Sequence, residues 1–176
     1  LMSGDELVGI DYRPKDGKLY AVGLQGNLYT LNPNNGEAIF LRKLIADPSD
    51  TTDGNASFTQ IMGDANLITV NFNPAADRLR VISNTGQNLR INVDTGATIT
   101  DGTINLATGS AAVVAGAYTN AFAGTGSTKL FSIDQNSDRI YLQNANAGTL
   151  GNSAALVSTF CICLRFPTPP SEINNT

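Results

Sequence analysis

The sequence contains no histidine, and without an imidazole neither a Ser-His-Asp nor a Cys-His catalytic arrangement can be assembled. The same absence leaves Cys161 and Cys163 without partners for a zinc site. If the two cysteines lie in a strand, their side chains share a face, and a bond between them would be strained. We interpret them either as two small buried residues or as a point of pairing with another chain.

Charged residues are scarce, at 15% of 176 residues with a formal net charge of −4. Lysine and arginine form no clusters, which argues against a nucleic-acid partner because neutralising phosphates needs grouped positive charge. No hydrophobic run approaches the length of a membrane span. The surface must be built largely from neutral Asn, Thr, Gly and Ser, and this composition favours a secreted protein at an extracellular or cell-surface location.

No signal peptide is visible, because Leu1 is not followed by a charged and then an apolar segment. A mature chain and an incomplete chain would both begin in this way. Secretion is therefore inferred from composition alone.

What the sequence does contain is repetition. Between positions 67 and 96, apolar residues alternate with polar ones in short runs, and clusters of Asn, Pro, Asp, Thr and Gly separate the runs. The alternating positions are Ile68, Val70 and Phe72, then Leu79 and Val81, then Leu89 and Ile91. This pattern predicts three consecutive antiparallel strands.

The same pattern occurs 60 positions earlier, and a looser third copy follows Val113. The pairs separated by 60 are Ile10 and Val70, Pro14 and Pro74, Leu19 and Leu79, Val22 and Ile82, Gly26 and Gly86, Leu31 and Ile91, Asn32 and Asn92, and Gly36 and Gly96. We therefore predict an all-β fold of antiparallel four-stranded meander units, arranged as β-propeller-like blades, about three of them in this chain.

The units are expected at about 7–45, 66–106 and 113–160, within one repeat domain of residues 1–160. A C-terminal tail occupies residues 161–176, and its part from Arg165 to Thr176, which contains three prolines, is expected to be extended. Val8, Ile10 and Tyr12 predict a half-buried first strand. The fourth strands are expected at 38–45, at 97–99 or 103–106, and at 156–160, and 58–62 is expected to be a turn of helix or a covering strand.

Polar residues recur near the ends of the first strands, which line the central channel of a propeller. They are Asp11, Arg13, Asn71, Asn73, Tyr118 and Asn120. These residues are candidates for binding a ligand. They can equally serve to satisfy the backbone of the turns.

An oxygen-rich loop interrupts the first repeat and contains Asp47, Asp50, Asp53 and Asn55. Carboxylate and amide oxygens are the ligands that Ca²⁺ prefers, so the loop is a candidate calcium site, although its spacing differs from that of an EF-hand. A solvated loop with Asx-turns is the other interpretation. Asp134, Asn136 and Asp138 begin like a calcium loop, but Arg139 stands where the sharp-turn glycine is expected, and a turn is predicted there.

Three stretches resemble the family catalogued as domain of unknown function 4394. They are LVGIDYRP at 7–14, DRLRVISNTGQNLR at 77–90 and AYTN at 117–120, within a likeness over about 7–160. The resemblance implies a bacterial, commonly exported, propeller-like β protein and implies no known activity. Members of the family continue with further strand units, whereas residues 161–176 do not repeat.

These observations favour a non-catalytic extracellular protein that binds an unknown ligand or serves as a structural, self-assembling unit. The alternative is a metal-dependent propeller hydrolase, resembling a lactonase, which would need convergent carboxylates. No cofactor is expected apart from the calcium ion considered above. Three units cannot close a propeller of 4–8 blades, so we expect a homo-oligomer or filament, formed through exposed blade faces and the tail, or a chain cut from a longer parent.

Overall fold

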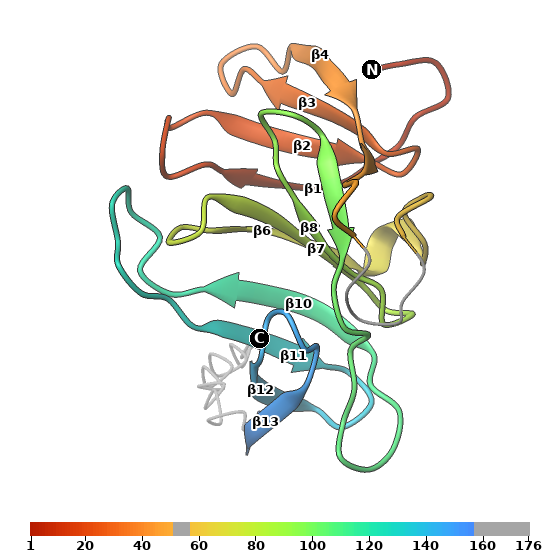
Figure 1. Cartoon of the computed structure of the whole chain (residues 1–176), viewed down its shortest axis with the longest axis vertical. Helices are drawn as coiled ribbons and strands as arrows, with labels where there is room; N and C mark the ends of the chain where they lie inside the picture. Colours follow the sequence, from red (N-terminus) through yellow and green to blue (C-terminus); the bar gives the residue numbers. More distant parts are fainter. Residues whose placement is uncertain (51–56, 157–176) are drawn as a thin grey trace, which may run out of the picture.

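The computed structural model describes residues 1–50 and 57–156, and in them the fold is all-β. Antiparallel strands form three sheets, which lie one above another in Figure 1. The helical structure of the described residues is limited to the short 3-10 helix η1 (Ala65–Leu67). The expectation of an all-β chain built from antiparallel meanders is confirmed.

We call the sheets A, B and C in chain order, and within each meander successive strands are hydrogen-bonded neighbours. Sheet A consists of β1 (Leu7–Tyr12), β2 (Leu19–Gly23), β3 (Asn27–Leu31) and β4 (Ala38–Lys43). Sheet B consists of β6 (Ile68–Asn73), β7 (Arg78–Ser83), β8 (Asn88–Ile91) and β9 (Ala97–Thr100), with β5 (Ile45–Ala46) added at its edge. Sheet C consists of β10 (Val113–Tyr118), β11 (Leu130–Asp134), β12 (Arg139–Gln143) and β13 (Leu150–Ala155).

The turns of sheets A and B repeat along with the strands. Gly36 and Gly96 end equivalent turns with φ of 74° and 81°, a backbone conformation that glycine adopts without strain. The N–H of Gly36 donates to the carbonyl of Asn32, and that of Gly96 donates to Asn92, at 2.8 and 2.7 Å. The turn chemistry read from the sequence therefore fixes the ends of these strands.

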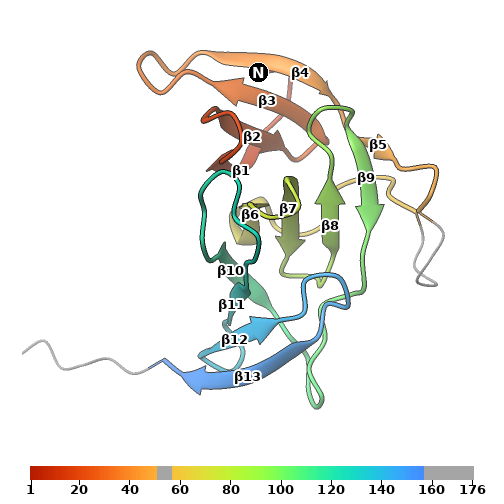
Figure 2. The same ribbon diagram turned by 60° about the vertical axis from the view of Figure 1, so that its left-hand side comes forward.

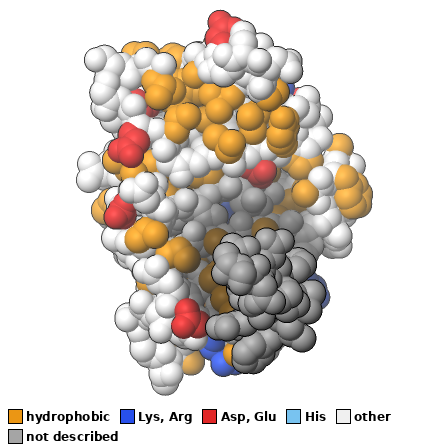
Figure 3. All heavy atoms as spheres, turned by 180° about the vertical axis from the view of Figure 1, so that it is seen from behind, with side chains coloured by type: hydrophobic (Ala, Val, Ile, Leu, Met, Phe, Trp, Pro, Cys, Tyr) orange, Lys and Arg blue, Asp and Glu red, His pale blue; other side chains and the backbone are white. Residues whose placement is uncertain are grey.

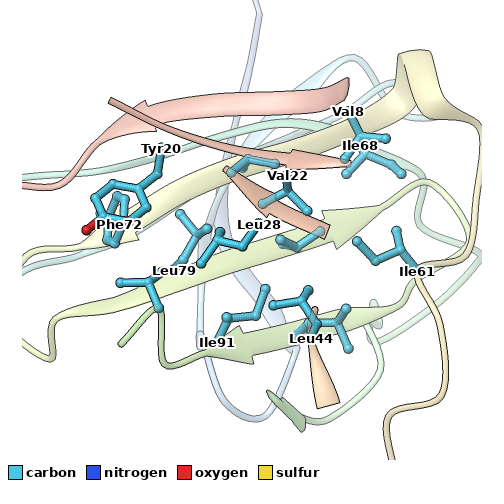
Figure 4. Packing of buried hydrophobic residues seen from close by; sticks show 14 of the residues in the cluster. Val8, Tyr20, Val22, Leu28, Leu44, Ile61, Ile68, Phe72, Leu79 and Ile91 are labelled. Carbon is cyan, nitrogen blue, oxygen red and sulfur yellow. The ribbon is translucent and has the colours of Figure 1, made fainter. Parts of the chain in front are cut away.

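The first strands of the three sheets lie side by side, since β6 packs against both β1 and β10. Each sheet thus has an upstream face, toward the preceding sheet, and a downstream face, toward the next. The larger core cluster joins the downstream face of sheet A to the upstream face of sheet B (Figure 4), and includes Tyr20, Val22, Leu28, Phe72, Leu79 and Ile91. The smaller cluster joins sheets B and C, and includes Ile82, Tyr118, Leu130 and Tyr141.

Strand β1 forms as predicted, but its faces differ from the prediction. Val8 is buried, whereas Ile10 and Tyr12 are each 52% exposed. Their equivalents in the repeat, Val70 and Phe72, are buried against sheet A. Ile10 and Tyr12 are exposed because no sheet precedes sheet A in the described residues, and a register shift between Leu7 and Gly9 takes Val8 out of the alternation.

The predicted fourth strand at 38–45 is wrong at its end. Strand β4 ends at Lys43, and β5 instead pairs in parallel with β9 of sheet B, as Figure 2 shows. In the second unit the fourth strand is β9, while Asn105 of the alternative segment forms an isolated bridge with Thr149. The link between two sheets is therefore hydrogen-bonded to the sheet that follows it.

Two other expectations also need correction. The fourth strand of the third unit is β13, which ends at Ala155 and so lies before the expected segment 156–160. Residues 157–160 of that segment lie outside the described residues. The segment 58–62 forms neither helix nor strand, but it places Phe58 and Ile61 in the core. In the part of the chain that the structure describes, no helix is long and apolar enough to cross a membrane.

Candidate functional site

The six residues predicted to bind a ligand lie at one end of the stack, because they come at the ends of β1, β6 and β10, and these strands are neighbours. The structure gives each of them a role within the fold. It does not test whether they also bind a ligand, so that role stays a prediction.

Asp11 and Asn71 join neighbouring first strands through the same contact. Asp11 Oδ2 accepts a hydrogen bond from the backbone N–H of Phe72 at 2.6 Å, and its Oδ1 accepts one from the N–H of Tyr12 at 2.9 Å. Asn71 Oδ1 accepts from the N–H of Tyr118 at 2.9 Å. Burial raises the pKa of Asp11, against the lowering effect of the two N–H donors.

Arg13 bridges the interface between sheets A and B. We call this interface, and the equivalent one between sheets B and C, a seam. Its side chain is buried, and it makes bidentate ion pairs with two carboxylates of sheet B, Asp77 at 2.6 and 2.7 Å and Asp94 at 2.7 and 2.8 Å. Its Nη1 also donates to Asp16 and to the Tyr20 hydroxyl, at 3.3 Å each. Since a guanidinium has five N–H groups, these contacts leave no donor for a ligand.

Arg13, Asp77 and Asp94 form an ion triad that we call the Arg13 clamp, and their contacts shift the pKa values of all three residues. Hydrogen bonds from the Arg13 guanidinium lower the pKa of Asp77 to about 2, from an ordinary 3.8, and also lower the pKa of Asp94. The two carboxylates in turn raise the pKa of Arg13. The clamp is therefore a permanent ion triad across the physiological pH range.

The seam between sheets B and C is different at the equivalent place. In the repeat Asn73 corresponds to Arg13, Thr128 to Asp77, and Asn146 to Asp94, so the charged triad is replaced by neutral side chains. Asn73 Oδ1 accepts from the N–H groups of Ala75 and Ala76 at 3.0 and 2.9 Å, and so stays within its own turn. Asn146, the equivalent of Asp94, is contacted instead by Arg80 of strand β7, whose Nη2 donates to its Oδ1 at 2.9 Å.

An open groove of about 520 Å³ lies where the clamp is missing. It runs beside the end of β10 and the β12–β13 turn, and its lining includes Asn73, Tyr118, Lys129, Gln143, Asn144 and Asn152. Two of the six predicted ligand-binding residues, Asn73 and Tyr118, are thus brought together in one groove. Asp11, Arg13, Asn71 and Asn120 are not among the lining residues; Asn120 Nδ2 donates to the Ser127 carbonyl at 3.0 Å.

Several side-chain acceptors of the groove are already engaged within the protein. The amide oxygens of Gln143 and Asn144 are engaged by the Ser132 hydroxyl at 2.6 Å and the Ala147 N–H at 3.2 Å, and that of Asn73 by its turn. Gln143 is 4% exposed and its buried Nε2 has no hydrogen-bond partner. Within the described residues, Lys129 Nζ likewise makes no ion pair, and Lys129 is the charged side chain of the lining.

A buried polar network that the sequence reading missed holds sheets B and C together. Arg80 is 3% exposed and donates to Asn88 Oδ1 and to Asn146 Oδ1, both at 2.9 Å. Asn88 in turn donates to the carbonyl of Ala145 at 2.9 Å. Arg80 alternates with the core residues Leu79 and Val81 and reads as solvent-facing, so the sequence carries no sign that sheet C covers it.

The candidate calcium loop is only partly within the described residues. Asp47 Oδ1 accepts from the N–H and hydroxyl of Ser49 at 2.9 and 2.7 Å, and Asp50 Oδ2 accepts from the N–H of Thr100 at 3.0 Å. Asp53 and Asn55 lie outside the described residues, as do Cys161 and Cys163. Across residues 1–50 and 57–156 no group of three or more His, Cys, Asp or Glu is placed to hold a metal ion.

The calcium interpretation stays a prediction. It can be tested by measuring the midpoint of thermal unfolding as a function of calcium concentration, for the unchanged protein and for Asp53→Asn. In the 134–138 segment, Asp134 Oδ2 accepts from the N–H of Ser137 at 3.0 Å. That segment is a turn, as predicted.

Fold and site together define an all-β repeat protein with one clamped and one open seam. The sequence model of the family described as Domain of unknown function (DUF4394) matches residues 1–160, and the chain belongs to that family. No curated protein matches the sequence.

Among solved structures, the chain is similar to an auxiliary nutrient binding protein from Bacteroides thetaiotaomicron VPI-5482, with 14% identity and a TM-score of 0.44. The likeness covers 79% of this chain and 34% of that protein, so the chain spans about a third of its length.

Proposed function

We propose that the protein is a non-catalytic, β-propeller-like binding protein that acts outside the cell, with its sheets as blades and the groove between sheets B and C as its binding site. The face-to-face packing of the sheets and the adjacency of β1, β6 and β10 support the blade arrangement. The low charged content of 15% supports the extracellular location.

The proposed binding role is supported mainly by one difference between the two seams. The repeat position that is Arg13 at the seam between sheets A and B is Asn73 at the seam between sheets B and C. The same repeat position closes one seam with two ion pairs and leaves a groove of about 520 Å³ at the other. A groove of this size, lined by polar side chains at the point where Arg13 closes the other seam, is suited to a ligand.

The chemistry of the groove favours a ligand rich in hydrogen-bond acceptors. The amide oxygens of Asn73, Gln143 and Asn144 are engaged within the protein, and the side-chain nitrogens of Asn73, Asn144 and Lys129 remain as donors. A carboxylate on a hydroxyl-bearing scaffold, such as a hexuronate unit, would accept from these groups. A neutral sugar of the same shape would lack the charge that Lys129 attracts.

An NMR titration of the labelled protein with a galacturonate oligosaccharide and with its neutral methyl ester tests this function. We expect the acidic sugar to shift the amide signals of Lys129, Gln143 and Asn144 more strongly than the ester does. Lys129→Gln removes this charge and should weaken binding at least about tenfold, which is a loss of about 1.4 kcal/mol. The sugar should be recovered unchanged.

Lys18→Gln is the matched control, because Lys18 is the exposed lysine at the equivalent place, directly before strand β2 of sheet A. It should leave the affinity for the acidic sugar unchanged. Conversion of the sugar to products would contradict a non-catalytic role. Equal loss of binding in Lys129→Gln and Lys18→Gln would remove the groove as the site.

A further inference from the structure

The two seams within the chain are made by one rule, in which the downstream face of a sheet meets the upstream face of the next. At each seam a side chain of the first strand accepts from a backbone N–H of the next first strand, Asp11 from Phe72 at 2.6 Å and Asn71 from Tyr118 at 2.9 Å. The acceptors are equivalent, since Asp11 is opposite Tyr20, and Asn71 is opposite Arg80, in the strand register.

Two faces of this stack are left without a neighbouring sheet in the described residues, the upstream face of sheet A and the downstream face of sheet C. On sheet A, Ile10 and Tyr12 are each 52% exposed. On sheet C, Phe131, Ile133 and Ile140 line an apolar groove of about 150 Å³ with Ala117. Hydrophobic side chains gather on the surface around sheet A (Figure 3), and apolar faces of this kind favour association.

Part of the upstream face of sheet A is covered by the chain itself. Asp5 Oδ2 accepts from the Tyr29 hydroxyl at 2.6 Å and from Asn27 Nδ2 at 2.9 Å. A Cβ on Gly23 would overlap the Asp5 carboxylate, so the N-terminal segment lies tightly against the sheet. The part that remains open is the end at which Ile10 and Tyr12 lie.

The hydrogen bonds of the two open faces are compatible with direct contact between them. The residue of sheet C that is equivalent to the acceptors Asp11 and Asn71 is Ala117, which lies opposite Phe131. Ala117 has no side-chain acceptor. The N–H that such an acceptor would meet is that of Tyr12, and Asp11 Oδ1 already accepts from it at 2.9 Å. A junction of sheet C with sheet A therefore does not leave the N–H of Tyr12 unpaired.

We propose that a second copy of this chain covers these faces, with the downstream face of sheet C of one copy packed on the upstream face of sheet A of the other. The contact is head-to-tail and continues the packing rule of the two seams within the chain. Two copies supply six sheets, which lies within the range of about 4–8 blades in closed propellers. The same contact is then made twice, and the ring is closed. This inference does not depend on the ligand of the groove.

Analytical ultracentrifugation of the full chain over a concentration series tests the proposal. We expect a species of twice the 18.5 kDa chain mass. Tyr12→Lys and Ala117→Lys should each raise the dimer dissociation constant at least about tenfold, because each places a charge in the apolar contact. Phe122→Lys is the control, since Phe122 is 59% exposed in the β10–β11 loop, and it should leave the mass unchanged.

Circular dichroism of each variant shows that loss of the dimer is not loss of the fold. Three results would overturn the proposal: a monomer at all concentrations, a dimer that Tyr12→Lys dissociates while Ala117→Lys does not, or species larger than two chains. The second result would indicate two copies of sheet A packed on each other. None of these results bears on whether the groove binds a ligand, which the titration above decides separately.

Discussion

Arg13 and Asn73 occupy the same place in the repeat, and the difference in reach between the two side chains decides whether a seam is closed or open. The planar guanidinium engages two carboxylates in bidentate pairs, which combine charge with fixed geometry. The shorter amide of Asn73 reaches only the N–H groups of its own turn. One residue position thus separates a structural contact from a candidate binding site.

The Arg13 clamp makes the stability of the protein depend on pH in the acid range. Arg13 lowers the pKa of Asp77 to about 2 from 3.8, and a lowered folded-state pKa contributes stability that is present above the ordinary pKa and is lost as the pH falls through the folded value. Asp77→Asn should therefore reduce the free energy of unfolding at pH 7 by on the order of 1–3 kcal/mol. The difference should shrink between about pH 4 and pH 2, as measured by urea denaturation.

Asp138→Asn provides the control for this experiment. Asp77 and Asp138 both have φ of 52°, a conformation that asparagine also tolerates, and no ion pair of Asp138 is formed within the described residues. Its stability curve should differ little from that of the unchanged protein. Parallel pH curves for the unchanged protein and Asp77→Asn would show that ionisation of Asp77 does not stabilise the fold.

The positions of the polar residues could be predicted from the sequence, but their partners could not. The 60-residue offset placed Asp11, Arg13, Asn71 and Asn73 at equivalent strand ends. Arg13, however, pairs with residues 64 and 81 positions away, and no local pattern reports such a distance.

Among the elements, the strands with alternating apolar residues were the ones that the sequence predicted. Strands β6, β7 and β8 follow the predicted runs, with Leu79 and Ile91 fully buried. Strand β13 was missed because its sequence, LGNSAA, contains small and polar residues without alternation. Strand β5 was missed because its two residues pair with the next sheet, and a period-2 pattern cannot show which sheet a strand joins.

The core between sheets A and B rests on side chains such as Leu79, which is 0% exposed. Leu79→Ala should reduce the free energy of unfolding by about 2–5 kcal/mol, through lost burial and the cavity that remains. Ile39→Ala, at a strand position that is 54% exposed, should cost less than about 1 kcal/mol. Equal shifts of the two denaturation midpoints would mean that the assigned sheet faces are inverted.

For the whole molecule, the sequence indicated the number of units but not which faces of the end sheets are open. The repeat predicts the same face for Ile10 as for Val70, yet one is exposed and the other buried. Burial at these positions is set by the neighbouring sheet and not by the strand itself. Periodicity can therefore assign a residue to a face, while only the order of the sheets tells whether that face is covered.

The clamp of Arg13 also has a consequence for the order of events in folding. Each meander pairs strands that follow one another in the chain, whereas the clamp must bring Arg13 to residues 64 and 81 positions away. Closing long loops costs entropy before a contact can repay it, so the meanders should form first and the clamp after the rate-limiting step. Arg13→Lys should accelerate unfolding at least about threefold and leave the refolding rate nearly unchanged in stopped-flow chevron measurements. A slower refolding limb would place the joining of sheets A and B in the transition state, and the protein would then fold from its seam outward.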